Sequence, residues 1–458
     1  MPLGHTHEIS KAADFLTATA RPPWFNRRVL QLDQLPGPAG VVPKFPGEVN
    51  PPPLPAFLRS GPADESVVNG SALRSLTVER LDGPDQLLAL VPACDELAAR
   101  MRPRLPFATG RWLLNWWARY SEKNLWLRDR FFVHTIRAPG GRLLAVAPLI
   151  LSERPGYGPL RSRGLSFFGS DKNVTELRGM ICAPEDEALA ARALLEHLSS
   201  IRDEWDWLVW HGIRCDSEAH AALSRVERFS WSRETIDYVL PLPSTWEEFR
   251  ATRSRNIKES LRKCYNSLKR DGHTFDFQVV TGPAALPASL RTFFELHGRR
   301  ARAENLVDHR DVFSLQQARG LMFDLAATAD EQPALCVFEL KIAGQVVASR
   351  LGFVLGDELY LYFTGYDPDW AAYSVMTTTV AEALKWAIER KIRQVNLTPG
   401  TDVSKTRWGA IPVRTADGVL VSPTRRARVV FGVLSELNAR SRPGTVLGKV
   451  VDRVRRGG

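Results

Sequence analysis

The alternation of hydrophobic and polar positions divides the chain into a short patternless part and a long patterned part. Residues 1 to about 70 show neither a period of 2 nor one of 3.6, and their prolines remove backbone donors and block helices, so we expect a largely disordered, Pro-rich leader. From Leu76 onward, alternating strand patterns and apolar-striped helix patterns follow one another. One such helix is predicted to run from Asp85 through Ala98 despite Pro92. This mixture predicts an α/β protein.

The order of predicted elements is repeated along the chain. Each copy consists of a helix, a two-stranded hairpin, a second helix and a buried strand. The first copy is predicted at residues 110–120, 131–136, 143–151, 185–200 and 207–210. The second copy is predicted at residues 312–327, 335–340, 346–355, 375–390 and 394–397. Two copies of one α/β unit explain this order, although any two α/β domains look similar at this level.

A strand that ends in proline marks the change from one half to the other, near residues 231–242, and Ser244 or Thr245 is placed to cap the helix that follows. The predicted organisation has four parts. They are a leader (1–70), an N-terminal domain (71–235), a C-terminal domain that carries the chemistry (236–424) and a basic tail (425–458).

The composition of the chain indicates a globular protein and argues against a membrane-spanning or disulfide-stabilised one. The chain of 458 residues is 44% hydrophobic, which is enough for two real cores, and its net charge of +10 favours an anionic partner. No apolar run is long enough to span a bilayer and no signal peptide is recognisable, so we expect a cytoplasmic protein whose basic tail allows peripheral association with the inner membrane. The five cysteines contain no CxxC pair, which argues against a disulfide framework and a zinc site. We expect no metal.

The most informative segment begins with a strand over residues 358–364. Its pattern places Leu359, Leu361 and Phe363 on one face and the intervening residues on the other. The run Gly365-Tyr366-Asp367-Pro368 ends the strand, and a helix then begins near Ser374. A helix N-terminus presents free backbone N–H groups and the positive end of the helix dipole, which is how a fold binds a pyrophosphate. The sequence therefore predicts a phosphate-binding turn.

The same order of strand, Gly-Tyr-Asp-Pro, helix start, long helix, strand, glycine and Lys-x-x-Trp at residues 405–408 resembles the C-terminal domain of the CelD/BcsL-like acetyltransferases. These form a branch of the GNAT superfamily associated with cellulose and exopolysaccharide biosynthesis. Phe107-Ala108-Thr109, Phe168-Gly169-Ser170 and Trp205-Asp206-Trp207 resemble the N-terminal pattern of that family. More distantly, the two-copy arrangement resembles the Fem-type aminoacyl transferases. The implied fold is two tandem GNAT-like domains, each a mixed, mostly antiparallel sheet flanked by helices.

The resemblance implies a bacterial enzyme that transfers an acyl group from acetyl-CoA, or another acyl-CoA, to an amine or hydroxyl of a saccharide or cell-envelope precursor. It implies no DNA partner, and tRNA only under the Fem-like alternative. The implied catalytic residues are Tyr366, Asp367 and Lys405. The implied cofactor-binding residues are Phe363, Thr364, Tyr373, Ser374, Val375, Met376, Thr377 and Thr378. The resemblance also implies that Trp408 binds substrate by stacking on a sugar ring. The basic helix over residues 254–269 can be a platform for a phosphorylated or polyanionic acceptor, with Arg255 and Asn256 at its start as substrate-binding residues.

The chain departs from the family at the phosphate turn, where Ser374-Val375-Met376-Thr377 contains no glycine. A phosphate cannot approach the backbone as closely without glycine. This leaves open a different donor or a non-catalytic binding protein on a degenerate GNAT fold. Tyr366-Asp367-Pro368 can also be a simple turn, Lys405 an exposed loop cation, and the basic helix over residues 254–269 a solvated face.

Overall fold

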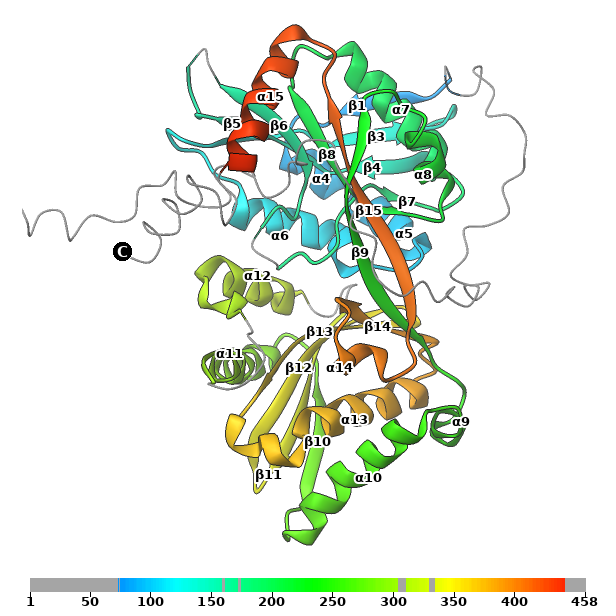
Figure 1. The fold of residues 1–458 in the computed structure, drawn as a ribbon, viewed down its shortest axis with the longest axis vertical. Coiled ribbons are helices and arrows are strands. Elements are labelled where there is room, and N and C mark those ends of the chain that lie inside the picture. The colour runs from blue at the N-terminus through cyan, green and yellow to red at the C-terminus, as the bar shows by residue number, and fades with distance from the viewer. Residues whose placement is uncertain are drawn as a thin grey trace, which may run out of the picture.

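The computed structural model describes residue 73 and residues 75–158, 161–171, 174–303, 310–328 and 334–440, with side chains up to residue 436. The predicted leader and the end of the predicted tail, residues 441–458, lie outside the described residues. The described chain forms two lobes stacked along the long axis (Figure 1).

The first half contains the predicted helices and buried strand, but three predicted elements are each divided in two. The strand expected over residues 131–136 is interrupted at residues 132–133, and the strand expected over residues 143–151 is interrupted at Pro148. A single helix through Pro92 is wrong: the chain forms two short helices that meet at Leu90, because proline has no N–H to donate and sits instead in the first turn of the second helix. The elements are β1 (Thr77–Arg80), α4 (Pro84–Ala89), α5 (Val91–Arg100), η4 (Pro106–Ala108), α6 (Gly110–Tyr120), β2 (Arg128–Phe131), β3 (His134–Arg137), β4 (Leu143–Ala147), β5 (Leu149–Arg154), β6 (Ser162–Phe167), β7 (Ile181–Cys182), α7 (Glu187–Ser200), β8 (Trp207–Arg214) and α8 (Glu218–Leu223).

In the second half the predicted helix cap is confirmed, since Thr245 and Glu248 form a reciprocal capping box. The elements are β9 (Phe229–Pro241), α9 (Trp246–Ala251), α10 (Arg255–Arg270), β10 (Phe275–Val280), α11 (Leu286–Arg302), η5 (Val312–Ser314), α12 (Gln316–Ala327), β11 (Ala334–Ile342), β12 (Gln345–Leu355), β13 (Glu358–Tyr366), η6 (Pro368–Tyr373), α13 (Val375–Glu389), β14 (Gln394–Pro399), α14 (Val403–Thr406), β15 (Ile411–Val421) and α15 (Arg425–Arg440).

The strands form two sheets, and the larger one joins the two halves. A four-stranded sheet has the order β1-β3-β4-β7, and an eleven-stranded sheet has the order β10-β11-β12-β13-β14-β9-β15-β8-β6-β5-β2. The runs β8-α8-β9 and β14-α14-β15 correspond, yet β9 pairs with β14 and β15 pairs with β8. Each half therefore gives its last strand to the sheet of the other half. The predicted boundary at residues 235 and 236 falls inside β9, which runs along both lobes (Figure 1).

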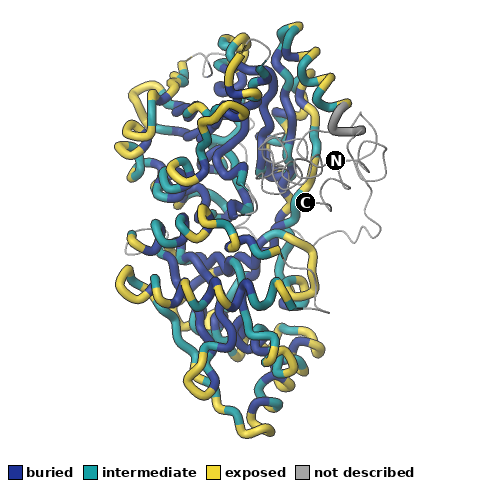
Figure 2. Tube along the Cα trace, turned by 90° about the vertical axis from the view of Figure 1, so that its left-hand side faces the viewer, coloured by how far each residue is buried: buried dark blue, intermediate teal, exposed yellow. Residues whose placement is uncertain are grey.

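Helices cover both faces of the second-half strands, with α10 and α13 on one face and α11 and α12 on the other (Figure 1). The core beneath α11 and α12 continues into the first half. Phe107 and Trp112, from the first half, lie edge-on to Tyr360 and Phe353, with ring centroids 5.3 and 5.9 Å apart. Buried chain runs through both lobes (Figure 2). The two halves consequently share one apolar core, and a site between them is held rigidly.

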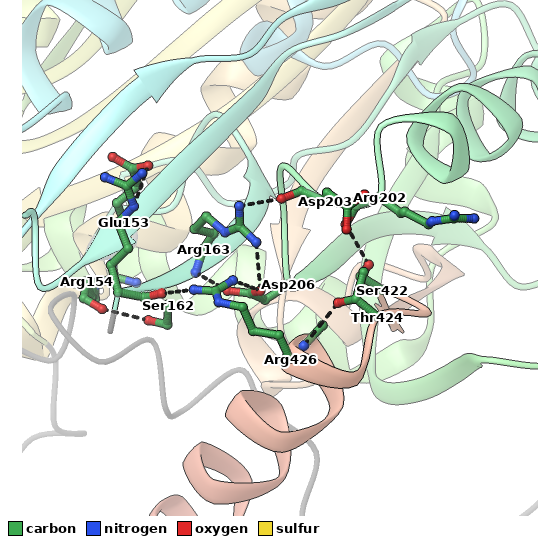
Figure 3. Close-up of polar contacts among 12 residues, drawn as sticks. Glu153, Arg154, Ser162, Arg163, Arg202, Asp203, Asp206, Ser422, Thr424 and Arg426 are labelled. Carbon is green, nitrogen blue, oxygen red and sulfur yellow. Dashed lines mark hydrogen bonds and ion pairs between the residues drawn. The ribbon is translucent and has the colours of Figure 1, made fainter. Parts of the chain in front are cut away.

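The beginning of the predicted basic tail is a folded helix. On α15, Phe431 packs against Trp207, with ring centroids 6.1 Å apart. Arg426 and Arg163 both donate hydrogen bonds to the buried carboxylate of Asp206 (Figure 3). The first part of the predicted basic tail, up to residue 436, is therefore held on the first half, because the apolar side of α15 is buried there.

Candidate active site

β13 and β14 lie side by side for three residue pairs and then separate. The parallel pairs are Glu358 with Gln394, Leu359 with Val395, and Tyr360 with Asn396. Beyond them β14 bends: Thr398 takes a φ of 73°, and its N–H donates to Asn396 Oδ1 over 2.8 Å. We call the opening between β13 and β14 beyond Tyr360 the fork. Within the fork, the main-chain N–H and C=O groups of β13 and β14 do not hydrogen-bond to each other.

On the other side of β13, the strand contains one extra residue. Arg350 faces Thr364, whereas Gly352 faces Leu361, so a bulge lies at residues 362–363. The predicted alternation fails at Phe363 for this reason. Its ring packs with Tyr362 and His297 rather than with Leu361. The bulge bends β13 where it leaves β14.

The helix α13 begins where the chain returns from β13. Ser374, immediately before it, has φ 54° and ψ 40°, the left-handed conformation that glycine adopts most easily. The turn thus forms without the glycine that the family pattern contains. The N–H of Thr377 already donates to the carbonyl of Ser374 over 2.8 Å, whereas the N–H groups of Val375 and Met376 have no carbonyl one turn earlier in the helix to bind, as at any helix start.

Arg407, from the segment after β14, reaches the start of α13. Its Nη2 donates to Thr377 Oγ1 over 2.8 Å, and its Nε is buried with no hydrogen-bond partner among the described residues. Burial lowers the pKa of the guanidinium. A cation at the positive end of a helix dipole is unfavourable by itself. An anion that bound the free N–H groups of α13 and Arg407 together would remove that repulsion, so these groups fit a phosphate.

The first half contributes a carboxylate to the fork. Asp171 accepts hydrogen bonds from the N–H groups of Val174 and Thr175, which shapes the turn that leads to Glu176. The phenol of Tyr360 donates to Glu176 Oε2 over 2.8 Å. Tyr362 donates to the carbonyl of Val174. Glu176 therefore lies against the last residue of β13 that pairs with β14.

Charged groups surround Glu176 and alter its ionisation. Burial raises the pKa of Glu176 to about 7, and the nearby Asp237 raises it too, while Tyr360, Lys405 and Arg350 lower it. Asp237, on β9, accepts from Asn396 Nδ2 over 2.6 Å, and burial raises its pKa to about 6. Two acids that titrate close to neutral pH beside two cations are typical of an active site.

Lys405 is half-buried, as a site residue would be, rather than a solvated loop cation. Its Nζ donates to the carbonyl of Pro399, the last residue of β14, and lies 3.5 Å from Asp402 Oδ2. Burial lowers the pKa of Lys405, and Asp402 and Glu176 oppose that effect. The ammonium group is thus held beside β14 within the electrostatic reach of Glu176.

The other two residues predicted as catalytic have different surroundings. Asp367 Oδ1 accepts from Arg299 over 2.6 Å and from the N–H of Asp369, so its carboxylate caps η6 and is held in an ion pair. The structure favours the simple turn for Asp367. Tyr366 lies under the guanidinium of Arg300, 5.5 Å from the ring centroid, at the end of β13. Its catalytic role stays a prediction.

Among the residues predicted to bind the cofactor, several side chains face away from the fork. The hydroxyl of Thr364 accepts a hydrogen bond from Arg300, and its carbonyl accepts one from the ring of His297. Val375 and Thr378 lie in the core at 1% and 0% exposure. The ring of Tyr373 packs against His273. Any contribution of Val375 and Thr378 to cofactor binding is therefore limited to their backbone, whereas Thr377 Oγ1 faces Arg407. A cofactor-binding role of Phe363, Thr364, Tyr373, Ser374 and Met376 stays a prediction.

The prediction that Trp408 stacks on a sugar is wrong. Its indole is 1% exposed and packs near Phe249, so no face of the ring is open. Arg255 points into solvent and pairs with Glu259 over 2.6 Å. No contact among the described residues joins Arg255 or Asn256 to the fork, and their role in substrate binding stays a prediction.

A cavity approaches the same cluster from the first half. It measures about 740 Å³ including its open mouth and is lined by apolar side chains together with Arg178, Arg214, Glu187 and Asp237. Asp237 thus lies both on the cavity wall and beside Asn396 at the fork. Among the described residues, no group of three or more His, Cys, Asp or Glu side chains is placed to hold a metal ion.

Sequence reasoning missed Glu176, Asp237, Arg350 and Arg407. Glu176 and Asp237 lie far along the chain from their partners, and the docking of residues 174–176 and the strand exchange bring them together. Arg407 reaches the start of α13 within the second half. One pattern in the sequence lies close to Glu176. It is Phe168-Gly169-Ser170, which resembles the N-terminal pattern of the CelD/BcsL-like family. Gly169 has φ 97°, and a Cβ there would lie 2.5 Å from Thr175 Cγ2, so this glycine is needed for the turn before Glu176.

Comparison with known proteins finds one family model and several solved structures that are similar to this chain. Residues 255–406, from α10 to α14, match the family model described as acetyltransferase (GNAT) domain. This part of the chain is therefore similar to GNAT domains. The sequence matches no curated protein. The structure is similar to that titled "Crystal structure of FemX", at 12% identity, 78% coverage of this chain, 100% coverage of that chain and a TM-score of 0.53.

Weaker likenesses have TM-scores below 0.5. A tandem GNAT protein from the clavulanic acid biosynthesis pathway is 11% identical, with 76% of this chain and 99% of that chain covered, at a TM-score of 0.38. L-PGS from Bacillus licheniformis is 12% identical, with 78% and 98% covered, at 0.42. The likeness to FemX establishes the fold alone. The predicted fold class is confirmed: two tandem GNAT-like units of mixed sheets flanked by helices.

Proposed function

We propose that the chain is a GNAT-type acyltransferase that moves an acyl group from acyl-CoA to an amine or hydroxyl of a saccharide or cell-envelope precursor. One observation carries the proposal: β13 and β14 separate beside the half-buried carboxylate of Glu176. Beyond them lies the N-terminus of α13 with Arg407, whose Nε has no hydrogen-bond partner among the described residues. The preference for a saccharide rests on the resemblance to the CelD/BcsL-like family, as does the proposal of a bacterial source.

The donor would be held by main-chain groups. The free N–H groups at the start of α13, with Arg407 and Thr377 Oγ1, would bind its pyrophosphate, and the backbone of β13 beyond Tyr360 would run beside its pantetheine arm. Bound acyl-CoA supplies an activated thioester carbonyl. Binding would also reduce the repulsion between Arg407 and the α13 dipole.

We assign proton transfer to Glu176. At neutral pH a carboxyl with a pKa of about 7 is partly ionised, and it can take the proton that the acceptor amine or hydroxyl loses on attack. Tyr360 holds Oε2 and so orients the carboxylate. Lys405 brings a positive charge close to the fork, where it can stabilise negative charge that develops on the carbonyl oxygen.

The acceptor would reach the fork through the cavity in the first half. The wall of the cavity includes Asp237, whose hydrogen bond to Asn396 links it to β14 at the fork. The donor and the acceptor would then approach the fork from different directions. Such an arrangement allows direct attack without an acyl-enzyme.

A second candidate function has a specific observation in its favour. The cations of α10 lie on its solvent-facing sides and form an exposed basic surface at Arg255, Lys258, Arg262, Lys263, Lys269 and Arg270. Together with the resemblance to Fem-type aminoacyl transferases, this surface suits an aminoacyl-tRNA donor. Under this alternative, binding of tRNA would weaken steeply with salt.

Calorimetric titration with acetyl-CoA and longer acyl-CoAs tests the proposal. We expect saturable binding, and we expect Arg407→Ala to weaken it by about 5- to 30-fold through loss of a charge-assisted contact to phosphate. Arg390→Ala is the matched control, because Arg390 lies at the opposite end of α13 and stacks on Trp386. Its affinity should equal that of the wild type.

Three results would contradict the assignment in different ways. Absence of heat with every acyl-CoA, combined with salt-sensitive tRNA binding, would favour the Fem-like alternative. Binding of acyl-CoA without transfer to any amine or hydroxyl would favour a non-catalytic binding protein. Equal weakening by Arg407→Ala and Arg390→Ala would show that the α13 N-terminus does not bind the donor.

A further inference from the structure

Two loops of the first half present large apolar side chains to solvent. Leu125 and Trp126, before β2, are 72% and 44% exposed, and Tyr157, after β5, is 48% exposed. The loops touch: the N–H of Gly156 donates to the carbonyl of Leu125 over 3.0 Å. A Cβ at residue 156 would lie 2.4 Å from the carbonyl oxygen of Asn124. The three side chains therefore belong to one surface at the edge of the eleven-stranded sheet.

The fold holds these side chains outward. Asn124 Oδ1 accepts from the N–H groups of both Trp126 and Leu127 over 2.9 Å, and the N–H of Asn124 donates to the carbonyl of Leu127 over 2.8 Å. Leu127 is buried at 1% exposure, whereas Leu125 and Trp126, directly before it, are exposed. A hydrogen-bonded turn that buries one leucine and exposes Leu125 and Trp126 is preformed, so ordering it on binding costs little entropy.

Cations surround the same surface. Arg128, Arg130 and Arg161 converge on the carboxylate of Glu153 at 3.8, 3.8 and 3.4 Å. Glu153 is 1% exposed, whereas the three arginine side chains are 36 to 44% exposed. The guanidinium of Arg128 also lies 5.7 Å from the ring centroid of Tyr157. One buried carboxylate cannot neutralise three guanidinium groups, so the surface keeps a positive charge.

The acidic side chains of these loops offset most of that charge but not all of it, because the three carboxylates of Glu122, Asp129 and Glu153 face the four cations Lys123, Arg128, Arg130 and Arg161. Glu122 and Asp129 are only half-exposed, and Asp129 accepts from the hydroxyl of Ser152 and from the N–H of Glu122. Lys123 is exposed and adds a further cation beside Leu125. We call Leu125, Trp126 and Tyr157, with Lys123, Arg128, Arg130 and Arg161, the loop-tip patch.

We propose that the loop-tip patch docks the protein onto an anionic membrane surface. Trp and Tyr side chains favour the boundary between headgroups and acyl chains, and a leucine at a loop tip can insert there. Arginine and lysine around them attract phosphate headgroups. Charge complementarity selects a lipid surface because the patch combines exposed apolar side chains with surrounding cations that outnumber the neighbouring carboxylates. This proposal does not depend on the transferase assignment.

Flotation of the full chain with vesicles tests the proposal. We expect binding to vesicles that contain phosphatidylglycerol and not to phosphatidylcholine alone, with affinity that falls as salt increases. Leu125→Ser combined with Trp126→Ser should reduce the affinity at least about tenfold, since two apolar side chains no longer insert. Both positions are exposed, so the unfolding temperature should not change.

A matched double variant distinguishes the patch from the basic C-terminal region. Val429 and Val433 are exposed at 66% and 54% on α15. Val429→Ser combined with Val433→Ser should bind vesicles like the wild type. Retained binding in the Leu125→Ser/Trp126→Ser variant, or loss only in the α15 variant, would overturn the proposal. A wild-type dimer that this loop variant dissociates, with no vesicle binding, would instead identify the patch as a contact between two copies.

Discussion

Single residues decide what the fork can do, and Glu176 is the most important of them. It comes from the first half, docks through Tyr360 onto β13 of the second, and carries a raised pKa because burial disfavours its charge. Lys405 was identified from sequence because Lys-x-x-Trp is a local pattern. Glu176 was not, because nothing local distinguishes a glutamate that will lie beside a strand more than 180 residues away.

Replacing Glu176 with glutamine should reduce activity and increase stability together. The folded state holds the Glu176 proton more tightly than the unfolded chain, whose pKa is 4.5. The wild type therefore loses stability as pH rises from below 4.5 towards 7, by on the order of 3 kcal/mol or less. Glu176→Gln should avoid this loss, so its advantage in the free energy of unfolding should grow between pH 5 and pH 8.

The same variant should lower kcat/KM by about 100-fold or more, because the proton acceptor is gone. The wild-type kcat/KM should rise with pH and level off above a midpoint near 7, as Glu176 ionises. Glu259→Gln, at an exposed ion pair on α10, is the control for both measurements. A variant with wild-type activity would exclude Glu176 as the base, and a pH-independent stability difference would exclude its raised pKa.

At the scale of elements, β13, the α13 turn and β14 form as the sequence predicts, but their details do not follow from pattern. Periodicity predicted the strand over 358–364, yet a one-residue bulge at residues 362–363 is set by pairing with β12 and turns Phe363 to the other face. The start of α13 was predicted at its observed position near Ser374. What the sequence could not show is that a serine accepts the left-handed conformation there.

Ser374→Gly should improve both the turn and the donor site. A residue with a Cβ in the left-handed region is strained by about 1 kcal/mol relative to glycine, so the free energy of unfolding should rise by up to about that amount. Glycine also lets a phosphate approach the α13 backbone more closely, so the Kd for acyl-CoA should fall. Thermal melts and calorimetry measure the two effects. Ser374→Ala, which keeps the Cβ, should show neither, and equal behaviour of the two variants would refute the argument.

At the scale of the whole molecule, the sequence predicted two related units but not how they join. The repeated order of elements is local information, whereas the exchange of β9 and β15 depends on pairing between strands that are far apart in the chain. The boundary expected near residues 231–242 falls on β9, but β9 does not separate the two units. It is the strand that both units share, not a link between them.

Neither half should fold alone. Residues 73–242 would lack β15, which covers the edge of β8, and residues 243–440 would lack β9, which covers the edge of β14. Expressed separately, each half should be insoluble or show no cooperative unfolding, whereas co-expression should yield a soluble complex. Circular dichroism melts and size-exclusion chromatography measure this. A half that unfolds cooperatively by itself would show that the exchanged strands are dispensable.

The exchanged strands also determine when the protein can fold during synthesis. β8 ends at Arg214, but its partner β15 begins at Ile411, so the ribosome must add about 200 residues before this pairing can form. At roughly 5 to 20 residues per second, β8 waits on the order of ten seconds or more with an open edge. For that period the nascent chain offers a strand that any other extended chain can join, so a holding chaperone should matter more for this protein than its finished stability suggests.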